Sequence, residues 1–234
     1  MQIYHKGFNY SQDGPGNRLV YHLQGCNFRC KWCSNPESLP LTSPEAFEMR
    51  PEDVLEEALR SRKLFFDGGG VTFTGGECTL QFDELRDSLR LLRSERINTC
   101  IETNASHPKL QELLPFVDHL IADLKLVETD LHRIYTGADN ASVLTNLKEV
   151  ADIGRSFLIR IPLINGVNTD PAPFVQFLRS ISTRPLTVEV LRYHEFGKDK
   201  WGDAYEIHDG FVTQEQYREF QAALRDAGCE VIET

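Results

Sequence analysis

The sequence predicts an α/β fold in the form of an open, partial barrel of six β–α units. Short runs rich in β-branched and aromatic residues alternate with longer amphipathic runs along the 234 residues, which is typical of parallel β–α–β units. Six main strands are too few for a closed eight-stranded barrel. With 41% hydrophobic and 26% charged residues, the chain has enough apolar material for a sizeable core. We expect a single domain over residues 1–234.

Each element follows from a local pattern. We expect strands at 19–24, 71–74, 99–103, 120–124, 157–163 and 187–192, with a short final strand at 230–232. Apolar residues at helical spacing, such as Leu85, Leu89 and Leu92, indicate helices. Pro51 suits a first helical position, and Gly228 suits a helix end. The expected helices are 51–62, 82–95, 142–153, 173–181 and 214–227.

Charge and hydropathy exclude some classes of function. The chain has 25 Lys and Arg against 35 Asp and Glu, a formal charge of −10, so it lacks the basic footprint of a nucleic-acid binder. No run reaches the ~18–20 apolar residues that span a bilayer, and no apolar signal segment opens the sequence. We therefore expect a cytoplasmic protein that uses neither nucleic acid nor membrane.

Three cysteines lie close together after the first predicted strand. Cys26, Cys30 and Cys33 follow a CxxxCxxC spacing, which lets one short loop present three thiolates to a common centre. Three ligands leave a fourth position open, as in catalytic metal sites, and cysteine ligation favours zinc or an iron–sulfur cluster. Half of a zinc site, completed by a distant His or Cys, is one alternative. A disulfide framework fits poorly with six cysteines in 234 residues.

Polar residues also follow the other predicted strands. In parallel α/β sheets, ligands bind beyond the carboxyl ends of the strands. The residues at those positions are Gly75, Gly76, Glu77, Glu102, Thr103, Asp123, Lys125, Arg160 and His194. A ligand site at this edge of the sheet is therefore predicted.

The cysteine spacing, followed by Gly75-Gly76-Glu77, resembles the radical S-adenosylmethionine (SAM) superfamily. The resemblance implies a partial (β/α)6 barrel of the radical SAM type. It also implies that Cys26, Cys30 and Cys33 hold a [4Fe–4S] cluster and that SAM chelates the fourth iron. Reductive cleavage of SAM then gives a 5′-deoxyadenosyl radical that removes a hydrogen atom from a substrate.

A narrower resemblance covers nearly the whole chain. Segment 11–18, with Asp13-Gly14-Pro15-Gly16, the run 70–81 and the run 193–201 are similar to the glycyl-radical-enzyme activases, in particular the compact ones. The implied partner is a glycyl radical enzyme, whose glycine loop donates a Cα hydrogen. No cysteine lies between Cys33 and Cys78, so we expect no ferredoxin-like insert. We expect an external electron donor such as flavodoxin or ferredoxin.

The resemblance also implies roles for single residues. Gly75, Gly76 and Glu77 would approach SAM, with Glu77 accepting from its ammonium group. Lys125 and Arg160 would face the SAM carboxylate, His194 its ribose and Trp32 its adenine. Glu102, Thr103 and Asp123 would bind a monovalent cation, and Asp13, Lys125 and Arg160 are the catalytic candidates.

Ordinary structural explanations stand beside these roles. The glycines could form only a turn, Trp32 could be a packed aromatic, and the cations could be solvent-exposed charges at strand ends. Two departures from the family pattern affect the cation site: Glu102 replaces an Asp, and Ala105 replaces a Gly.

Two other functions compete with the activase. The 7-carboxy-7-deazaguanine synthases are also compact radical SAM enzymes, but they have a Gln-Gly-Glu-Gly stretch where this chain has Asp13-Gly14-Pro15-Gly16. A non-catalytic metal-binding or electron-carrier module would bind zinc or a cluster without cleaving SAM.

Overall fold

The computed structural model describes residues 1–232, without the side chain of residue 203. The chain divides into two compact units. Unit 1 comprises Met1–Asn27, Glu37–Thr103 and Lys109–Ile121, and unit 2 comprises Phe28–Pro36, Asn104–Pro108 and Ala122–Thr234. Within the described residues, none of the helices combines the length and the apolar character needed to cross a membrane.

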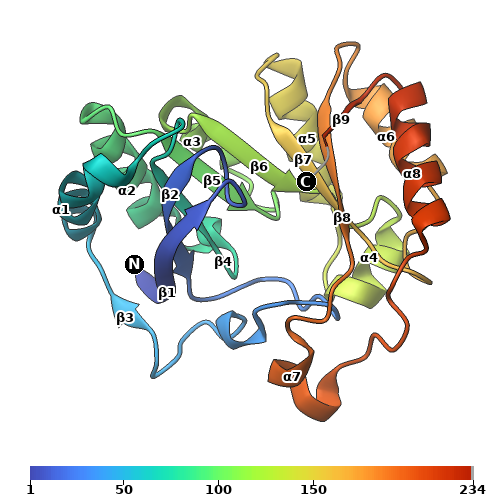
Figure 1. Ribbon diagram of the computed structural model, residues 1–234, viewed down its shortest axis with the longest axis horizontal. Coiled ribbons are helices and arrows are strands. Elements are labelled where there is room, and N and C mark those ends of the chain that lie inside the picture. Colours follow the sequence, from blue (N-terminus) through green and yellow to red (C-terminus); the bar gives the residue numbers. More distant parts are fainter. Residues whose placement is uncertain (233–234) are drawn as a thin grey trace. The chain divides into compact units, whose positions relative to one another are not determined.

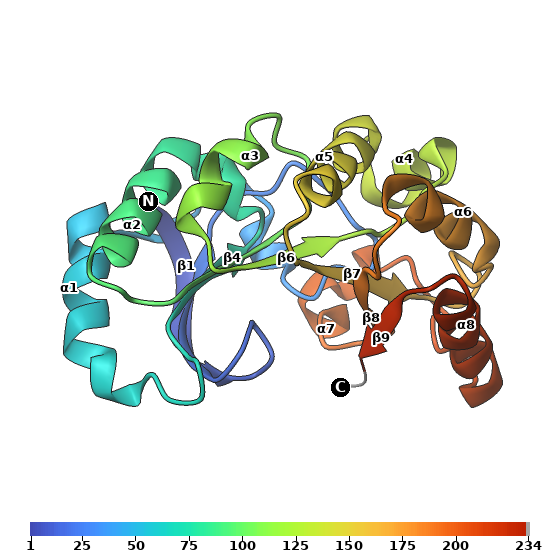
Figure 2. The same ribbon diagram turned by 90° about the horizontal axis from the view of Figure 1, so that it is seen from above.

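Unit 1 contains a mixed sheet in the strand order β3-β1-β2-β4-β5. Strand β1 runs antiparallel to β2 and β3, whereas β2, β4 and β5 are parallel. The helices α1 and α2 lie side by side in both views (Figures 1 and 2). The elements are β1 (Gln2–Tyr10), β2 (Asn17–Leu23), β3 (Phe47–Glu48), α1 (Pro51–Ser61), β4 (Val71–Gly75), α2 (Phe82–Ser94), β5 (Thr99–Thr103) and α3 (Leu110–Leu113).

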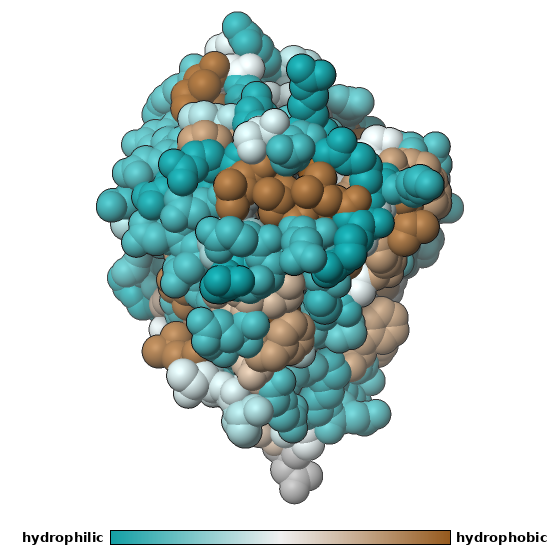
Figure 3. All heavy atoms as spheres, turned by 90° about the vertical axis from the view of Figure 1, so that its left-hand side faces the viewer, coloured by the Kyte–Doolittle hydropathy of each residue, from teal (hydrophilic) through white to brown (hydrophobic). Residues whose placement is uncertain are grey.

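The core of unit 1 is built from the patterns seen in the sequence. Leu85, Leu89 and Leu92 of α2 are fully buried, as are Val71 and Phe73 of β4. The opposite faces of the helices carry charged residues, so the surface on the α1 side is mostly hydrophilic, with one elongated apolar patch above its centre (Figure 3).

Unit 2 contains the parallel strands β7, β8 and β9. Helices α6 and α8 lie side by side, with the rings of Phe174 and Phe220 5.3 Å apart at their centroids (Figure 2). Strand β6 (His119–Asp123) begins in unit 1 and ends in unit 2. The other elements are α4 (Thr129–Thr136), α5 (Ala141–Asp152), β7 (Leu158–Leu163), α6 (Ala172–Ile181), β8 (Thr187–Arg192), α7 (Lys198–Trp201), α8 (Gln214–Asp226) and β9 (Glu230–Ile232).

Parallel strands joined through helices confirm the predicted α/β class. Every predicted strand and helix is present, with bounds that differ by at most two residues. The sequence analysis did not predict β1, β3, α3, α4 or α7. Strand β1 mixes polar and apolar residues without clean alternation, and helices of eight residues or fewer show little repeated spacing. The single-domain organisation stays a prediction.

Candidate functional site

The segment Asp13–Gly16 lies in the turn between β1 and β2 of unit 1, as its Gly and Pro content predicts. Asp13 Oδ2 accepts a hydrogen bond of 2.5 Å from Asn9, and the Asp13 carbonyl accepts one of 2.7 Å from Thr72 Oγ1. A Cβ at Gly16 would lie 2.4 Å from the carbonyl oxygens of Phe66 and Asp67. The turn is therefore fitted closely to the chain beneath it.

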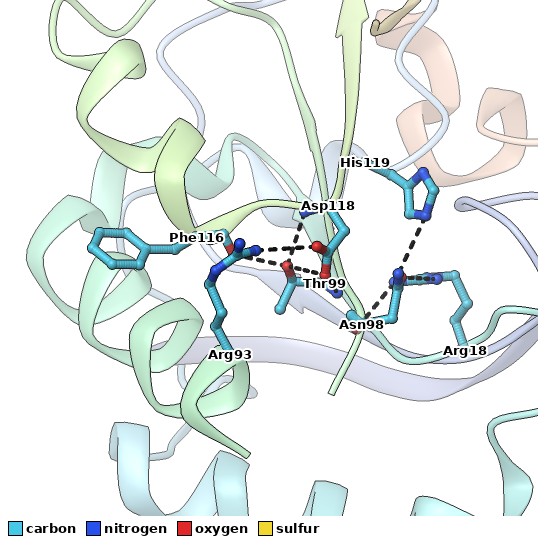
Figure 4. A network of polar contacts seen from close by, with 7 residues as sticks. All are labelled: Arg18, Arg93, Asn98, Thr99, Phe116, Asp118 and His119. Atoms are coloured by element: carbon cyan, nitrogen blue, oxygen red, sulfur yellow. Dashed lines mark hydrogen bonds and ion pairs between the residues drawn. The ribbon is translucent and has the colours of Figure 1, made fainter. Parts of the chain in front are cut away.

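The Arg18 side chain stabilises this turn through hydrogen bonds. Its side chain is completely buried and donates to Thr72 Oγ1 at 2.7 Å and to the carbonyls of Pro15 at 3.0 Å and Val71 at 2.9 Å. It also donates to Asn98 Oδ1 at 2.9 Å, and Figure 4 shows Asn98 between Arg18 and His119. Burial lowers the pKa of Arg18 from its ordinary value. The charge is retained through these acceptors.

Gly75 and Gly76 do more than form a turn. A Cβ at Gly75 would lie 2.2 Å from Leu23 N, and a Cβ at Gly76 would lie 2.2 Å from Gly25 O. The Gly76 amide donates to Leu23 O at 2.9 Å, and the Glu77 amide donates to Gly25 O at 2.8 Å. Because only glycine permits this approach, the Gly-Gly-Glu backbone lies along the segment that leads into Cys26.

The Glu77 carboxylate is held in place by its own unit. It is 1% exposed, and its Oε1 accepts from Thr79 N at 3.0 Å, Thr79 Oγ1 at 2.5 Å and Thr103 Oγ1 at 2.6 Å. The structure thus joins two predicted site residues, Glu77 and Thr103. The hydrogen bond from the SAM ammonium to Glu77 stays a prediction.

Glu102 directly precedes Thr103 on β5. Its Oε2 accepts from Thr74 Oγ1 at 3.3 Å, and its carbonyl accepts from the Cys78 thiol at 3.4 Å. Burial, together with the charges of Glu77 and Glu102, raises the pKa of Cys78 well above its usual value. Cys78 therefore stays a protonated thiol and is a poor metal ligand.

In unit 2, the cysteine loop rests on helix α4, which the sequence analysis missed. The amides of Arg29 and Lys31 donate to the carbonyls of Thr136 at 2.6 Å and Tyr135 at 3.0 Å. Loop rings also meet helix rings: Phe28 with His132 at 5.1 Å, and Trp32 with Tyr135 at 6.2 Å. Trp32 is thus a packed aromatic as it stands, and its contact with adenine stays a prediction. The helix end was detectable from Gly137, which caps α4 with a φ of 77°.

The run 193–201 reaches the same loop from a distant part of the sequence. A Cβ at Gly197 would lie 2.3 Å from the Cys33 carbonyl oxygen, to which Trp201 Nε1 donates at 2.8 Å. Lys200 Nζ donates to the Ser34 carbonyl at 3.0 Å. The Gly, Lys and Trp of this run therefore support the loop that carries Cys30 and Cys33.

The cysteines have the chemistry that an iron–sulfur cluster needs. Cys30 and Cys33 share a turn in unit 2, in which Cys33 N donates to Cys30 O at 3.0 Å, and Asn35 N donates to Cys33 Sγ at 3.4 Å. An amide donor to a ligating sulfur stabilises its negative charge. Cys26 is buried in unit 1. Among residues 1–232, no three His, Cys, Asp or Glu side chains are grouped to hold a metal ion, so joint ligation by the triplet stays a prediction.

The two predicted cations of unit 2 are each paired with a carboxylate. Lys125 Nζ lies 2.7 Å from Asp123 Oδ2, and Arg160 Nε lies 2.6 Å from Glu189 Oε2. Arg160 and Glu189 face each other across β7 and β8, with side chains 9% and 2% exposed. Arg160 is therefore not a solvent-exposed charge. The sequence analysis missed Glu189, although a Glu inside the apolar strand 187–192 was a signal that it needs a buried partner.

The remaining predicted residue, His194, lies just beyond β8. Its ring stacks on the Phe196 ring, with 4.2 Å between the centroids, and partial desolvation lowers its pKa.

At the Asn104-Ala105 departure, the backbone adopts a conformation that favours glycine, because Ala105 has a φ of 58°. Asn146 Nδ2 donates to the carbonyls of Ala105 at 2.7 Å and His107 at 2.9 Å, which holds this left-handed residue.

Comparison with known proteins identifies the family. The family model described as the radical SAM superfamily matches residues 20–178. A pyruvate formate-lyase-activating enzyme of Streptococcus mutans is 34% identical over 201 residues, covering 82% of this chain and 76% of that protein. One from Staphylococcus aureus is 32% identical over 213 residues, covering 84% of each chain.

Solved structures agree with this. A domain of a pyruvate-formate lyase-activating enzyme from Bacteroides vulgatus has a TM-score of 0.59 and 28% identity, covering 71% of this chain and all of that one. A radical SAM methyltransferase from Sphaerobacter thermophilus, at 16% identity, shares the fold with a TM-score of 0.70, covering 96% of this chain and 67% of that one. The predicted partial barrel of the radical SAM type is confirmed. The chain belongs to the radical SAM superfamily and, within it, to the family of the pyruvate formate-lyase-activating enzymes.

Proposed function

We propose that this protein cleaves SAM reductively and removes a Cα hydrogen from a glycine of a partner glycyl radical enzyme. The main support is the 34% identity to an activating enzyme over 82% of the chain. The three runs that carry the resemblance each have a close-packed role, as the contacts of Gly16, Gly76 and Gly197 show. Such contacts restrict these positions to glycine.

Cys26, Cys30 and Cys33 are the proposed ligands of a [4Fe–4S] cluster. When bound, the cluster and SAM supply the electron and the hydrogen-abstracting radical. The protein positions the thiolates, and helix α4 fixes the half of the loop that carries Cys30 and Cys33. A loop held by backbone hydrogen bonds loses little conformational freedom when it takes up the cluster.

Binding of SAM is proposed to use residues that the protein already orients. Glu189 holds Arg160 and Asp123 holds Lys125, so each cation is restrained before a carboxylate arrives. Glu77, fixed by Thr79 and Thr103, is the proposed acceptor for the SAM ammonium. Gly75, Gly76, Trp32 and His194 are proposed to complete the site, and Glu102, Thr103 and Asp123 are the proposed ligands of a monovalent cation.

The partner's glycine loop is proposed to approach the turn that contains Asp13. With no cysteine between Cys33 and Cys78, we propose one cluster and an external electron donor such as flavodoxin or ferredoxin. A cluster held by thiolates requires reduced cysteines, which favours the cytoplasm as the working compartment.

Mass spectrometry of 5′-deoxyadenosine tests this function. The anaerobically reconstituted, reduced protein is incubated with SAM and a glycine-loop peptide deuterated at the glycine Cα. We expect deuterium in the 5′-deoxyadenosine, and none of this product from Cys30→Ala. Cys229→Ala, a cysteine outside the triplet, is the matched control and should behave as the wild type.

Other outcomes distinguish the alternatives. Unlabelled 5′-deoxyadenosine, formed with a partner protein that carries deuterated glycine as well as with the deuterated peptide, would contradict hydrogen abstraction from glycine and direct attention to the deazaguanine reaction. A colourless, zinc-containing protein without SAM cleavage would identify a non-catalytic metal-binding module. SAM cleavage retained in Cys30→Ala would exclude the proposed ligand set.

A further inference from the structure

Unit 2 contains a cavity of about 660 Å³ whose lining, apart from His194, the proposed function does not use. It lies between the end of β8 and one side of α8, two elements of the same unit. Its volume is in the range of small-molecule sites, which is about 300–1,000 Å³. The lining residues are Val190, Leu191, Arg192, His194, Gln214, Tyr217, Arg218, Gln221 and Arg225.

The charge of this cavity is opposite to that of the whole chain. Three of the lining residues are arginines and none is Asp or Glu, although the chain has a formal charge of −10. Within residues 1–232, Arg192 and Arg218 form no ion pair with a carboxylate of the protein. Arginine binds planar or tetrahedral oxyanions through paired N–H donors. The lining therefore favours an anionic occupant.

A buried donor points to the same conclusion independently. Gln221 is only 3% exposed, and its Nε2 has no hydrogen-bond partner within the described residues. Buried side-chain amides are nearly always hydrogen-bonded, so an amide without a partner indicates a missing acceptor. Gln221 lines the cavity, and an occupant with oxygen acceptors would satisfy Nε2 once the side chain turns toward it. The cavity is much larger than one water molecule, which occupies about 30 Å³.

The cavity is also partly fixed in shape. The Arg192 guanidinium lies 3.9 Å from the centre of the Tyr217 ring and donates to Gln214 Oε1 at 2.5 Å. Tyr217 in turn donates its hydroxyl to the Val190 carbonyl at 3.0 Å, which ties α8 to β8. An arginine stacked in this way has less freedom to lose when it binds a ligand.

We propose that this cavity binds an oxyanion, the carboxylate or phosphate group of a small organic molecule. Arg192 and Arg218 bind the charged oxygens, and Gln221 Nε2 donates to one of them. His194 also lines the cavity, so the occupant lies against a residue that is separately proposed to contact SAM. The inference rests on unit 2 alone and stands whether or not the protein activates a glycyl radical enzyme.

Titration followed by NMR tests the proposal directly. The side-chain amide signal of Gln221 in the full-length protein is assigned by its loss in Gln221→Leu. The protein is then titrated with inorganic phosphate, with citrate, and with sodium chloride at matched ionic strength. We expect a saturable shift of the Gln221 amide with phosphate or citrate and not with chloride. The tighter of the two anions identifies the recognised group.

Two arginine variants distinguish a specific anion-binding site from general attraction between opposite charges. Arg218→Ala should lower the affinity for the tighter-binding anion about tenfold, which is the change expected when one charge-assisted hydrogen bond is lost. Arg90→Ala removes an exposed arginine of α2 and should leave the affinity unchanged. Both substitutions are on exposed helix surfaces and should not affect folding.

Three results would overturn the proposal. They are the absence of a saturable Gln221 shift with either anion, an equal response to chloride, and an unchanged affinity in Arg218→Ala. A thermal shift measurement adds a second readout, because a ligand that binds the native state raises its melting temperature. Phosphate or citrate should raise the melting temperature of the wild type more than that of Gln221→Leu, and an equal rise would contradict the role of Gln221.

Discussion

The two units hold their predicted site residues by different means. Unit 1 relies on close backbone packing and one buried cation: Gly76 lies against Gly25, and Arg18 supports the turn at Asp13. Unit 2 also has a close-packed glycine, Gly197, but it relies more on side-chain partners from other elements, as in the Arg160–Glu189 pair and the Phe28–His132 contact. Backbone packing of this kind requires glycine and is visible in the sequence, whereas side-chain partners can be recognised only when the fold is known.

The largest effect is expected where unit 1 depends on a single side chain. Arg18→Ala removes the donor for Thr72 Oγ1, Asn98 Oδ1 and four backbone carbonyls. We expect the free energy of unfolding, measured in urea, to fall by about 4 kcal/mol, because each buried acceptor that loses its donor costs about 1–3 kcal/mol and the missing side chain leaves a cavity. Arg90→Ala is the exposed control and should cost less than about 0.5 kcal/mol. Equal losses in the two variants would show that burial of Arg18 contributes nothing.

The Arg160–Glu189 pair is the corresponding test for unit 2. Glu189→Gln keeps the shape but removes the charge that faces Arg160, and we expect a loss of about 3 kcal/mol in urea unfolding. Glu56→Gln disrupts an arginine–carboxylate pair of the same 2.6 Å length, but with side chains 66% and 68% exposed. That control should lose less than about 1 kcal/mol.

A second substitution makes this test stricter. In the double variant Glu189→Gln/Arg160→Met, the buried charge is gone, so most of the lost stability should return. If the double variant is less stable than Glu189→Gln, the pair is not the source of the loss. Loss of SAM binding in Glu189→Gln, measured by calorimetry, would support the role of Glu189 in positioning Arg160.

Gly76 tests whether close backbone packing is necessary in unit 1. Gly76→Ala places a Cβ 2.2 Å from the Gly25 carbonyl, and we expect a loss of about 2 kcal/mol, typical of overpacking. Gly7→Ala is the matched control, because its nearest neighbour would be a flexible His5 side-chain atom at 3.7 Å. Equal stability of the two variants in urea would contradict the close approach.

The smallest expected effect is the pH dependence of stability that comes from His132 of α4, the helix that contacts the cysteine loop. Burial lowers the pKa of His132 from its ordinary value of 6.5. Below about pH 6.5, the unfolded chain therefore takes up a proton before the folded chain does. Stability due to this group is complete above pH 6.5 and is lost as the pH falls, with a slope of at most about 1.4 kcal/mol per pH unit.

Variants of two histidines check this. Urea unfolding between pH 5 and pH 7.5 should show a shallower pH dependence for His132→Gln than for the wild type. His208→Gln changes an exposed histidine and should keep the wild-type slope. A slope unchanged in His132→Gln would mean that His132 does not titrate differently on folding.

The comparison of the units also explains what could be predicted from the sequence. Local patterns were sufficient for the parallel strands, the long helices and the three runs with close-packed glycines. Arg160 and His194 were predicted as site residues because they lie in or follow a strand of known direction, and their role stays a prediction. These features depend on residues that are near one another in the chain.

The features that were missed depend on contacts across the chain. Glu189 lies 29 positions from its partner Arg160, and His132 and Tyr135 lie 104 and 103 positions from Phe28 and Trp32. No local spacing in the sequence indicates these contacts. Strand β1 was missed because its pairing with β2 and β3, and not its own alternation, keeps it in the sheet. Gln221 was expected only as part of an amphipathic helix, and its orphaned amide is visible only in the structure.

The central claim is that Cys26, which lies in unit 1, and Cys30 and Cys33, which lie in unit 2, hold one cluster. The most direct test is to reconstitute the protein without air and to measure its iron content, its sulfide content and its visible spectrum. We predict about four irons per chain in the wild type and in Cys229→Ala, and loss of the cluster in each single Ala variant of the triplet. A full cluster in any of the three triplet variants, or its loss in Cys229→Ala, would contradict the account.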